Sequence, residues 1–547
     1  MRDFIKRIGT RLMKLKKFLT FTLAALTACA TLSLAACDDT EEVQAPTDVA
    51  AVSEETVGES GIKIIKDVAL TAEDYAFAIR KDNTELLEDV NGLLQEWEED
   101  GSLDTLINSY FDGTATFSYE NKTSTPQEGD FIMATNAYFP PFESVKGSKF
   151  TGVDVEIAYK FAKEFGKTLF VYDMEFDSII PSVQTGKSDI GMAGMTVNET
   201  RLQQVNFATS YYSSSQVISV AADNTLFDEC ETALEIEEIL SSLGEDFVIG
   251  TQNATTGHMY ALGNADFGYN GFPNLTVKSY NTGALAMKDL QNGKIDAVIL
   301  DLQPSLMIVE SMDTDDKSVF EIFYDQFIVH EGYKNFFTGL GNTMMIAVFG
   351  LLIGFALGCV LVTVKLIPSK NILVRILSKI CDLYVTLFRG TPMVVQLLLM
   401  HFALFPAMGL DISSVVEAMI IFGMNSGAYI SEILRGGINA VDRGQMEAGR
   451  SLGFGFTRTM TRIILPQAIK NILPTLGNEF IALVKETSVV SFIAVMDLTK
   501  SFQNIAAATY EYFIPYIALA AVYLVIVLLI SKLVKMMEKR LAKNERK

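Results

Sequence analysis

Residues 447–466 read EAGRSLGFGFTRTMTRIILP, and this stretch decides how the second half of the chain is organised. Its first residues suit a short helix, and Gly453 permits the tight turn that would end it. The surrounding segment, 435–472, is basic and lies between two apolar segments. Because basic loops of membrane proteins stay on the cytoplasmic side, we expect a helical loop that faces the cytoplasm.

Apolar runs around this loop are long enough to cross a bilayer, which takes about 20 residues. Three runs without charge cover residues 335–364, 390–410 and 512–531, and two more cover 412–434 and 473–496. The last two are interrupted by Glu417, Glu479, Lys485 and Glu486. Charged groups inside a span usually face the bundle interior or a cavity. Five spans that begin outside place every basic segment and the basic C-terminal tail inside, whereas four spans would place that tail outside.

Charge is unevenly distributed along the chain. Residues 331–547 hold 21 Lys and Arg against 13 Asp and Glu, and residues 1–330 hold 23 against 53. An acidic soluble part therefore precedes a basic membrane part, and the soluble part lacks the basic surface that nucleic-acid binding needs. The five cysteines and three scattered histidines show no disulfide or metal-ligand spacing. We expect neither a nucleic-acid partner nor a metal site.

The N-terminus has the pattern of a leader peptide. Basic residues precede an apolar stretch that ends in LAAC, residues 34–37. This ending resembles a bacterial lipobox and predicts a signal peptide over 1–37 with a membrane lipid on Cys37; an uncleaved anchor helix is the alternative. Met13 is an alternative start to the first methionine. Residues 38–60 are acidic and without periodicity, so we expect a flexible tether.

The stretch 447–466 resembles the coupling-helix signature of ABC importer permeases at every fixed position. Those positions are Glu447, Ala448, Gly449, Gly453, Ile463, Leu465 and Pro466. Three other segments, 387–397, 427–441 and 483–495, resemble the polar amino-acid branch of these permeases. The resemblance implies an all-α permease domain of five transmembrane helices over 335–547.

In that family the short coupling helix seats in a cleft of a separate ATPase subunit, and two permease copies surround one pathway. The resemblance therefore implies a dimer of ATPase subunits and a second copy of this chain as partners, which makes the chain a homodimer. No nucleotide-binding loop of the form G-x-x-x-x-G-K-[ST] occurs in the sequence. We expect the chain to bind no cofactor, because ATP is used by the partner ATPase.

Strand and helix patterns alternate from residue 131 to 310, which predicts parallel α/β architecture. Four segments there resemble the periplasmic-type binding proteins for polar amino acids: YFPPFE (138–143), FTGVDVEIAYKFAKEFG (150–166), the stretch from Phe176 to Arg201, and GKIDAVILD (293–301). The resemblance implies a two-lobed, type II binding domain whose lobes close over a ligand by a hinge motion.

A free amino acid needs one anion site, one cation site and a surface for its side chain. In the family pattern, Arg201 offers a bidentate guanidinium to the α-carboxylate, and Thr196 adds a hydroxyl. Thr256 is expected near a helix N-terminus, whose free amides also favour an anion. Asp301 matches the residue that accepts hydrogen bonds from the α-ammonium.

The remaining positions of the pattern concern the body of the ligand. Phe139 and Phe176 match the aromatic rings that sandwich it, and Gly194 matches the position that offers a backbone carbonyl. Asn136 stands where relatives that bind lysine or arginine tend to carry an acid, so a neutral polar amino acid is favoured. The side-chain end is left open, with three candidates: Gln252, Leu300 and His258.

One piece of the binding domain stands in an unusual place. The C-terminal piece that the family carries after Asp301 is missing there, and residues 71–112 resemble it. We therefore predict a circular permutation, in which 61–113 complete a domain over 61–310, followed by a linker over 311–334. Because chain termini of a domain often lie close together, such a rearrangement is feasible. A remnant of a second binding domain is the rival interpretation.

Together these patterns favour the substrate-binding and permease subunit of an ATP-driven importer for polar amino acids, in the bacterial plasma membrane with the binding domain outside. A ligand-gated channel or receptor with the same two-lobed sensor is the alternative. The sequence shows neither a filter loop such as TVGYG nor a signalling domain. A dehydratase on the same fold would leave the coupling stretch unexplained, so we expect a transporter subunit rather than an enzyme.

Overall fold

The computed structural model describes residues 60–123, 125–265, 267–313, 318–367, 371–410, 412–509 and 512–543. The predicted leader, with Cys37, and the predicted tether apart from Ser60 lie outside these residues. Residues 57–547 form one unit by their contacts.

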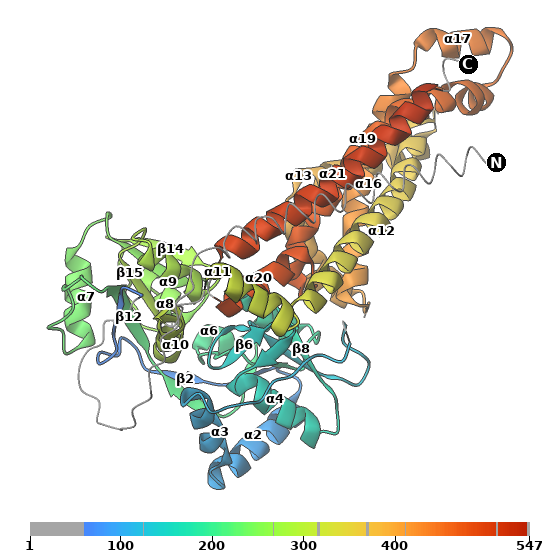
Figure 1. Ribbon diagram of the computed structural model, residues 1–547. Coiled ribbons are helices and arrows are strands. Elements are labelled where there is room, and N and C mark those ends of the chain that lie inside the picture. Colours follow the sequence, from blue (N-terminus) through green and yellow to red (C-terminus); the bar gives the residue numbers. More distant parts are fainter. Residues whose placement is uncertain are drawn as a thin grey trace, which may run out of the picture. The chain divides into compact units, whose positions relative to one another are not determined.

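Two five-stranded sheets form the two lobes of an α/β region (Figure 1). The first lobe has the strand order β10 (Asn206–Phe207), β3 (Ala78–Ile79), β9 (Ile190–Gly191), β4 (Phe131–Thr135) and β8 (Leu169–Asp173). The second lobe has the order β1 (Ile62–Ile65), β12 (Gln216–Ala221), β15 (Ala297–Asp301), β13 (Val248–Gln252) and β14 (Thr276–Tyr280). Strand β4 runs parallel to β8 and β9, and β13 runs parallel to β14 and β15. Ligands of such sheets bind beyond the carboxyl ends of parallel strands.

Short helices and two small sheets surround these strands. The helices are α4 (Val153–Glu164), η1 (Phe176–Ser178), α5 (Ile179–Gln184), α6 (Glu199–Leu202), α7 (Ala233–Ser242), α8 (Thr256–Leu262) and α9 (Gly283–Gln291). The small sheets pair β2 (Glu73–Tyr75) with β11 (Tyr212–Ser214), and β5 (Tyr138–Phe139) with β6 (Glu143–Lys146) and β7 (Lys149–Thr151). The longest of these helices, α4, turns its apolar side chains into the core, where Ile157 and Phe161 are fully buried.

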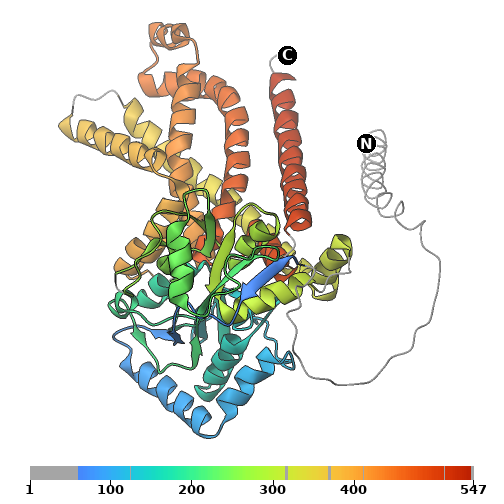
Figure 2. The same cartoon turned by 90° about the vertical axis from the view of Figure 1, so that its left-hand side faces the viewer.

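Residues 62–111, which precede the main α/β region in sequence, contribute to both lobes. Strand β1 pairs antiparallel with β12 in the second lobe, and β3 pairs with β9 and β10 in the first. Figure 2 shows β1 beside the strands of the second lobe. Helices α2 (Thr84–Glu99) and α3 (Ser102–Phe111) follow, and the Trp97 ring of α2 stacks on Phe161 of α4. The two lobes therefore share this early segment.

The predicted linker, 311–334, is largely helical. Helix α10 (Leu302–Asp313) runs past the predicted end of the binding domain at residue 310. It is followed by α11 (Val319–Tyr324) and by one π-helical turn, η2 (Asp325–Val329). The chain then enters the first long apolar helix, α12 (Tyr333–Leu366).

The remainder is helical and agrees only in part with the five predicted spans. Its elements are α13 (Ile372–Gly390), α14 (Met393–Leu399), η3 (Met400–Leu404), α15 (Phe405–Ala407), α16 (Ser414–Asn439), α17 (Arg443–Ser451), α18 (Phe456–Thr459), η4 (Met460–Ile464), α19 (Leu465–Glu486), η5 (Thr487–Ile493), α20 (Leu498–Thr509) and α21 (Phe513–Lys543). Among the described residues, α12 and residues 513–540 are each long and apolar enough to cross a membrane. The two predicted spans that contain charged residues correspond to α16 and α19. Both are long helices, but they are less apolar than α12 and residues 513–540.

The charge-free run 390–410 is not the single span that its composition predicted. The chain bends by 110° between α13 and the helix over 393–407, and only the two together are long and apolar enough for a span. The bend falls at Thr391 and Pro392, both in extended conformation. A residue before proline avoids the helical region, and proline has no N–H to continue the helix. Charge alone did not reveal this break.

Glycines set the closest helix packing in the membrane region. Gly350, Gly354 and Gly358 of α12 face α16. A Cβ on Gly354 would lie 2.8 Å from the Cβ of Ser426 and 3.0 Å from the backbone nitrogen of Gly427. Small residues let membrane helices approach closely, where van der Waals packing replaces the hydrophobic effect. This packing fixes α16, whose C-terminal end leads into α17.

Candidate functional site

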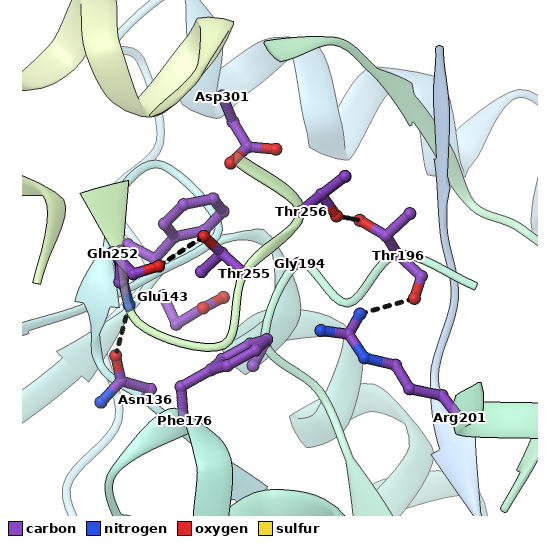
Figure 3. Close-up of a pocket in the computed structure, with 12 residues that line it drawn as sticks. Asn136, Glu143, Phe176, Gly194, Thr196, Arg201, Gln252, Thr255, Thr256 and Asp301 are labelled. Carbon is purple, nitrogen blue, oxygen red and sulfur yellow. Dashed lines mark hydrogen bonds between the residues drawn. The ribbon is translucent and has the colours of Figure 1, made fainter. Parts of the chain in front are cut away.

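A small pocket lies between the two lobes (Figure 3). It is lined by the eight residues that the sequence predicted for ligand binding: Asn136, Phe139, Phe176, Gly194, Thr196, Arg201, Thr256 and Asp301. Four further residues line it: Glu143, Ala193, Gln252 and Thr255. Asn136, Phe176 and the residues from Ala193 to Thr196 follow β4, β8 and β9 of the first lobe, which also supplies Phe139 and Glu143 from β5 and β6 and Arg201 from α6. The second lobe supplies its residues from the ends of β13 and β15 and the start of α8.

Arg201 is the cation of this pocket and is buried. It lies on the short helix α6, where its amide donates to the capping side chain of Asn198 over 2.7 Å. Its guanidinium donates to the carbonyl of Thr196 over 2.6 Å and, across the lobes, to that of Ala254 over 3.1 Å. Burial lowers the pKa of Arg201 to about 10, so it is protonated at neutral pH. Within the described part of the chain these bonds use two of the five guanidinium N–H donors, which leaves three for an anion. The Phe176 ring lies 5.4 Å from the guanidinium carbon.

Asp301 is the anion on the opposite side of the pocket, at the end of β15. The hydroxyl of Tyr75 donates a hydrogen bond to its carboxylate. Burial raises the pKa of Asp301 to about 7, and the nearby Glu73 carboxylate adds to this increase. Burial also raises the pKa of Tyr75, with a further contribution from Asp301. The Asp301 carboxyl group is therefore suited to bind a cation, because a nearby cation favours the charged form of a carboxylate.

A chain of hydroxyl groups connects the two lobes beside these charges. Thr256, the first residue of α8, donates to Thr196 over 3.0 Å, and Thr196 donates to Glu73 over 2.6 Å. Thr71 donates to the other oxygen of Glu73 over 2.7 Å. Figure 3 shows Thr256 and Thr196 pointing toward each other.

Gly194 has a backbone that only glycine adopts without strain at this place. Its φ is +51°, and a Cβ there would lie 2.7 Å from the Phe139 ring. Its amide donates to Asp154 over 3.1 Å, and the hydroxyl of Tyr211 donates to the same carboxylate over 2.6 Å. Asp154 thus holds the loop that presents Gly194 to the pocket.

The amide side chains of Asn136 and Gln252 meet at the far end of the pocket. Asn136 donates to the carbonyl of Met174 over 2.8 Å and accepts from Gln252 over 3.4 Å. Gln252 had been one of three candidates for the side-chain end, and it does line the pocket. The other two are wrong. Leu300 packs against Gly283, and His258 makes a hydrogen bond of 2.8 Å with Thr251.

Glu143 adds a carboxyl group that the sequence did not predict as a site. It is fully buried, and in the described part of the chain its two oxygens have no hydrogen bond of good geometry. Burial raises the pKa of Glu143 well above its usual range, and the neighbouring Asp154 raises it further. Burial also raises the pKa of Asp154, to about 7. These surroundings favour the neutral form of Glu143, which can both donate and accept a hydrogen bond.

The predicted coupling segment forms α17, at the end of α16 remote from the lobes. Ser414 at the start of α16 bonds with Tyr172 of the first lobe, and a helix of this length spans about 39 Å. Glu447 and Ala448 are exposed on α17, whereas Gly449 is buried. A Cβ on Gly449 would lie 2.6 Å from the Thr459 methyl carbon. Gly453 has φ +82° and ends the turn, where the neighbouring Leu452 keeps 75% of its surface exposed.

Two family models match the two parts of the chain. The model for binding-protein-dependent transport system inner membrane components matches residues 350–543, and the model for bacterial extracellular solute-binding proteins, family 3, matches residues 131–246. The chain is 42% identical over 199 residues to a protein named as glutamine transport system permease protein GlnP in Rickettsia bellii, covering 89% of that protein and 36% of this chain. The chain belongs to the polar amino-acid ABC importers.

Further relatives are similar in the same region. The arginine transport system permease protein ArtQ of Bacillus subtilis is 39% identical over 207 residues, which cover 92% of that protein and 38% of this chain. A crystal structure described as an amino acid ABC transporter with histidines is 40% identical, with a TM-score of 0.36, over 38% of this chain and 95% of that one. In this family the chain is an importer subunit of the inner membrane in which binding and permease domains are fused, with an amino acid as substrate and a separate ATPase as partner.

Two functional residues of this importer escaped prediction because of where they stand in the sequence. Glu73 and Tyr75 contact the pocket residues Thr196 and Asp301, yet they precede the recognisable binding-domain motifs by some sixty residues. Their signal was the resemblance of residues 71–112 to the piece that the family carries at the C-terminal end of the binding domain. Glu143 ends the quoted motif YFPPFE and could have been found there as a carboxyl group at the end of an apolar run.

Proposed function

We propose that the pocket binds a zwitterionic amino acid through its two opposed charges. Arg201 takes the α-carboxylate with its free donors, helped by Thr256 at the start of α8. Asp301 takes the α-ammonium, together with the carbonyl of Gly194. The rings of Phe139 and Phe176 enclose the aliphatic part of the ligand. The observation that carries this proposal is the burial of one arginine and one aspartate in the same closed pocket, since each needs a partner of opposite charge.

The substrate we favour is a neutral polar amino acid, with an amide side chain as the best match. The far end of the pocket offers the amides of Asn136 and Gln252, which can donate and accept. Burial raises the pKa of Glu143 and so favours its neutral form there. The relatives are named for glutamine and for arginine, and a pocket without a charged carboxylate at its far end favours the former.

The assembly we propose contains two copies of this chain and two ATPase subunits. Each exposed coupling helix, with Glu447 and Ala448 on its surface, seats in one ATPase subunit and transmits the closure driven by ATP. The chain itself binds no cofactor. The binding domain lies outside the plasma membrane, held by lipid on Cys37, and α17 and the C-terminus lie in the cytoplasm, in accordance with the basic loops.

We also propose that the binding domain arose by circular permutation. In support, residues 62–111 place β1 in the five-stranded sheet of the second lobe and β3 in that of the first. They also place α2 and α3 on the first lobe. The expected consequence is that a fragment over 61–313 folds, whereas one that begins at residue 128 does not, because the latter loses β1 and β3 and exposes the apolar faces they cover. Circular dichroism and thermal unfolding of the two fragments test this. Equal folding of both would favour a remnant of a second domain instead.

The binding role is tested with the full chain in lipid nanodiscs. We expect at least one neutral polar amino acid among the twenty to raise the melting temperature, because a ligand that binds only the folded state stabilises it. Arg201→Ala should abolish this shift. Arg80→Ala is the matched control, since Arg80 lies in the same domain with its side chain 42% exposed and paired with Asp82.

Two results would contradict the proposal. A chain that none of the twenty stabilises would exclude a free amino acid as ligand. An amino acid that binds but is never accumulated by vesicles containing the chain and its ATPase would favour the receptor alternative.

A further inference from the structure

Helix α20 carries buried polar side chains at the junction of the two regions. Lys500, Ser501 and Asn504 keep only 2%, 1% and 1% of their surface exposed. Lysine is almost never buried unless it is paired. The binding domain helps to bury these side chains, since α20 contacts β6 of that domain as well as α12 and α21 (Figure 1). This helix is therefore a place where the membrane region meets the ligand-binding region.

Two residues of the first lobe complete this junction. The Nζ of Lys500 lies 2.9 Å from Oδ2 of Asp173 and 4.5 Å from the centre of the Tyr138 ring. One helical turn further on, Asn504 accepts a hydrogen bond of 2.7 Å from the Tyr138 hydroxyl. Because side chains four residues apart share one helix face, these four residues form a single contact, which we call the α20 contact.

The two charges of the α20 contact are removed from water. The side chains of Lys500 and Asp173 are 3% and 4% exposed. Their facing atoms are within ion-pair distance, and among the residues that the structure describes neither atom has a hydrogen-bond partner of good geometry. Charge attraction and the Tyr138 ring therefore hold the ammonium. Removing either charge would leave the other buried and unpaired, which costs far more than the loss of a surface ion pair.

The lobe side of this contact belongs to the wall of the ligand pocket. The second carboxylate oxygen of Asp173, Oδ1, accepts from the amide of Ala137 over 3.2 Å. Tyr138 directly precedes Phe139 and follows Asn136 by two positions, and both of these residues line the pocket. One carboxylate thus binds the membrane region with one oxygen and the pocket loop with the other.

A contact between the two lobes connects the α20 contact with closure of the pocket. Gln252 of the second lobe donates to Asn136 of the first, and this hydrogen bond requires the lobes to be closed. We propose that Lys500 is a positioning residue for transport, which senses through Asp173 whether an amino acid has closed the pocket. The inference rests on the proposed function, since it requires the pocket to bind an amino acid.

A second ion pair between the same two regions offers a matched control. The Nζ of Lys187 lies 2.6 Å from Oε1 of Glu417, a fully buried residue of α16 that also bonds with His401. Lys187 follows α5 in the first lobe and does not line the pocket. Lys187→Met therefore removes a charged contact between the regions without touching the pocket loop.

The test measures hydrogen exchange of the backbone amides of 498–509 in the full chain in nanodiscs, with L-glutamine as the first probe and the other proteinogenic amino acids after it. In the unaltered chain a stabilising amino acid should slow this exchange about fivefold or more, the lower range of couplings between linked sites. Lys500→Met should lose the slowing while its thermal shift with the amino acid persists. Lys500→Arg and Lys187→Met should keep both.

The outcomes separate this inference from the function it rests on. If an amino acid raises the melting temperature but leaves α20 exchange unchanged in the unaltered chain, the sensing role is wrong. It is equally wrong if Lys187→Met loses the slowing as fully as Lys500→Met. A chain that none of the twenty stabilises overturns the proposed function instead. Should Lys500→Met fail to fold, Asp173→Asn carries the same expectation, because it removes the charge and keeps an acceptor for Ala137.

Discussion

The ligand pocket and the coupling helix are built in opposite ways. In the pocket, Arg201, Asp301 and Thr196 are buried and have hydrogen-bond partners within this chain. On α17, Glu447 and Ala448 are exposed, and Gly449 is the one buried residue of this helix. A buried site formed within one chain suits a small ligand. An exposed helix that ends in an exposed apolar residue, Leu452, suits binding to another protein. Changes in the two places should therefore separate amino-acid binding from transport.

The largest effect is expected from Asp301→Asn. The variant keeps the shape of the pocket and loses the charge that pairs with an α-ammonium. We expect about 100-fold weaker binding, since hydrogen bonds to charged groups are worth about 1.5–3 kcal/mol. Isothermal titration of the full chain with the stabilising amino acid measures this. An affinity within threefold of the unaltered chain, about 0.6 kcal/mol, would remove Asp301 from the cation site.

A change on the coupling helix should do the reverse. Gly449→Ala places a Cβ 2.6 Å from the Thr459 methyl carbon, and we expect amino-acid uptake to fall about tenfold with the binding affinity unchanged. Adding Thr459→Ser removes that methyl group and should restore most of the uptake. Uptake of labelled amino acid by cells that express the chain with its ATPase provides the measurement. A parallel loss of binding would mean that the two regions are not separable.

How far the sequence alone reached also differs between the two regions. All eight predicted binding residues line one pocket, because motif spacing determines which strand ends they follow and parallel strands bring those ends together. The expectation that Leu300 and His258 line the side-chain end was wrong. Strand alternation and helix rotation decide which side chains face the pocket, and a sequence motif does not contain that information. Glu73 and Tyr75 stand far from the recognisable motifs in the sequence, and the pairing of β2 with β11 brings them to the pocket.

In the membrane region, composition predicted where apolar helices lie but not where they bend. The break at Thr391 and Pro392 depends on backbone geometry, which a count of charges ignores. The charge of Glu417 was correctly expected to face inward, and it is buried in a bond with His401. Its partner Lys187 comes from the binding domain, a contact that depends on how two regions of one chain pack.

The pH dependence of binding provides a smaller test of the pocket. Burial and Glu73 raise the pKa of Asp301 to about 7, so in the free chain this group becomes protonated as the pH falls below 7. Only the carboxylate pairs with an α-ammonium, and the affinity should therefore fall by up to about tenfold for each pH unit below 7. Above pH 7 it should level off. Titrations from pH 5 to 8 check this, and the Asp301→Asn variant should show a flat profile over the same range.

The smallest effect concerns the choice of substrate at the far end of the pocket. Asn136→Asp places a carboxylate where relatives that bind cationic amino acids carry an acid, next to the amide of Gln252. We expect the ratio of arginine to glutamine affinity to rise about fivefold, equal to about 1 kcal/mol. Asn136→Ser is the control, because it shortens the side chain without adding charge. If both variants change the ratio equally, the far end selects by size, and the amide pair loses its role in specificity.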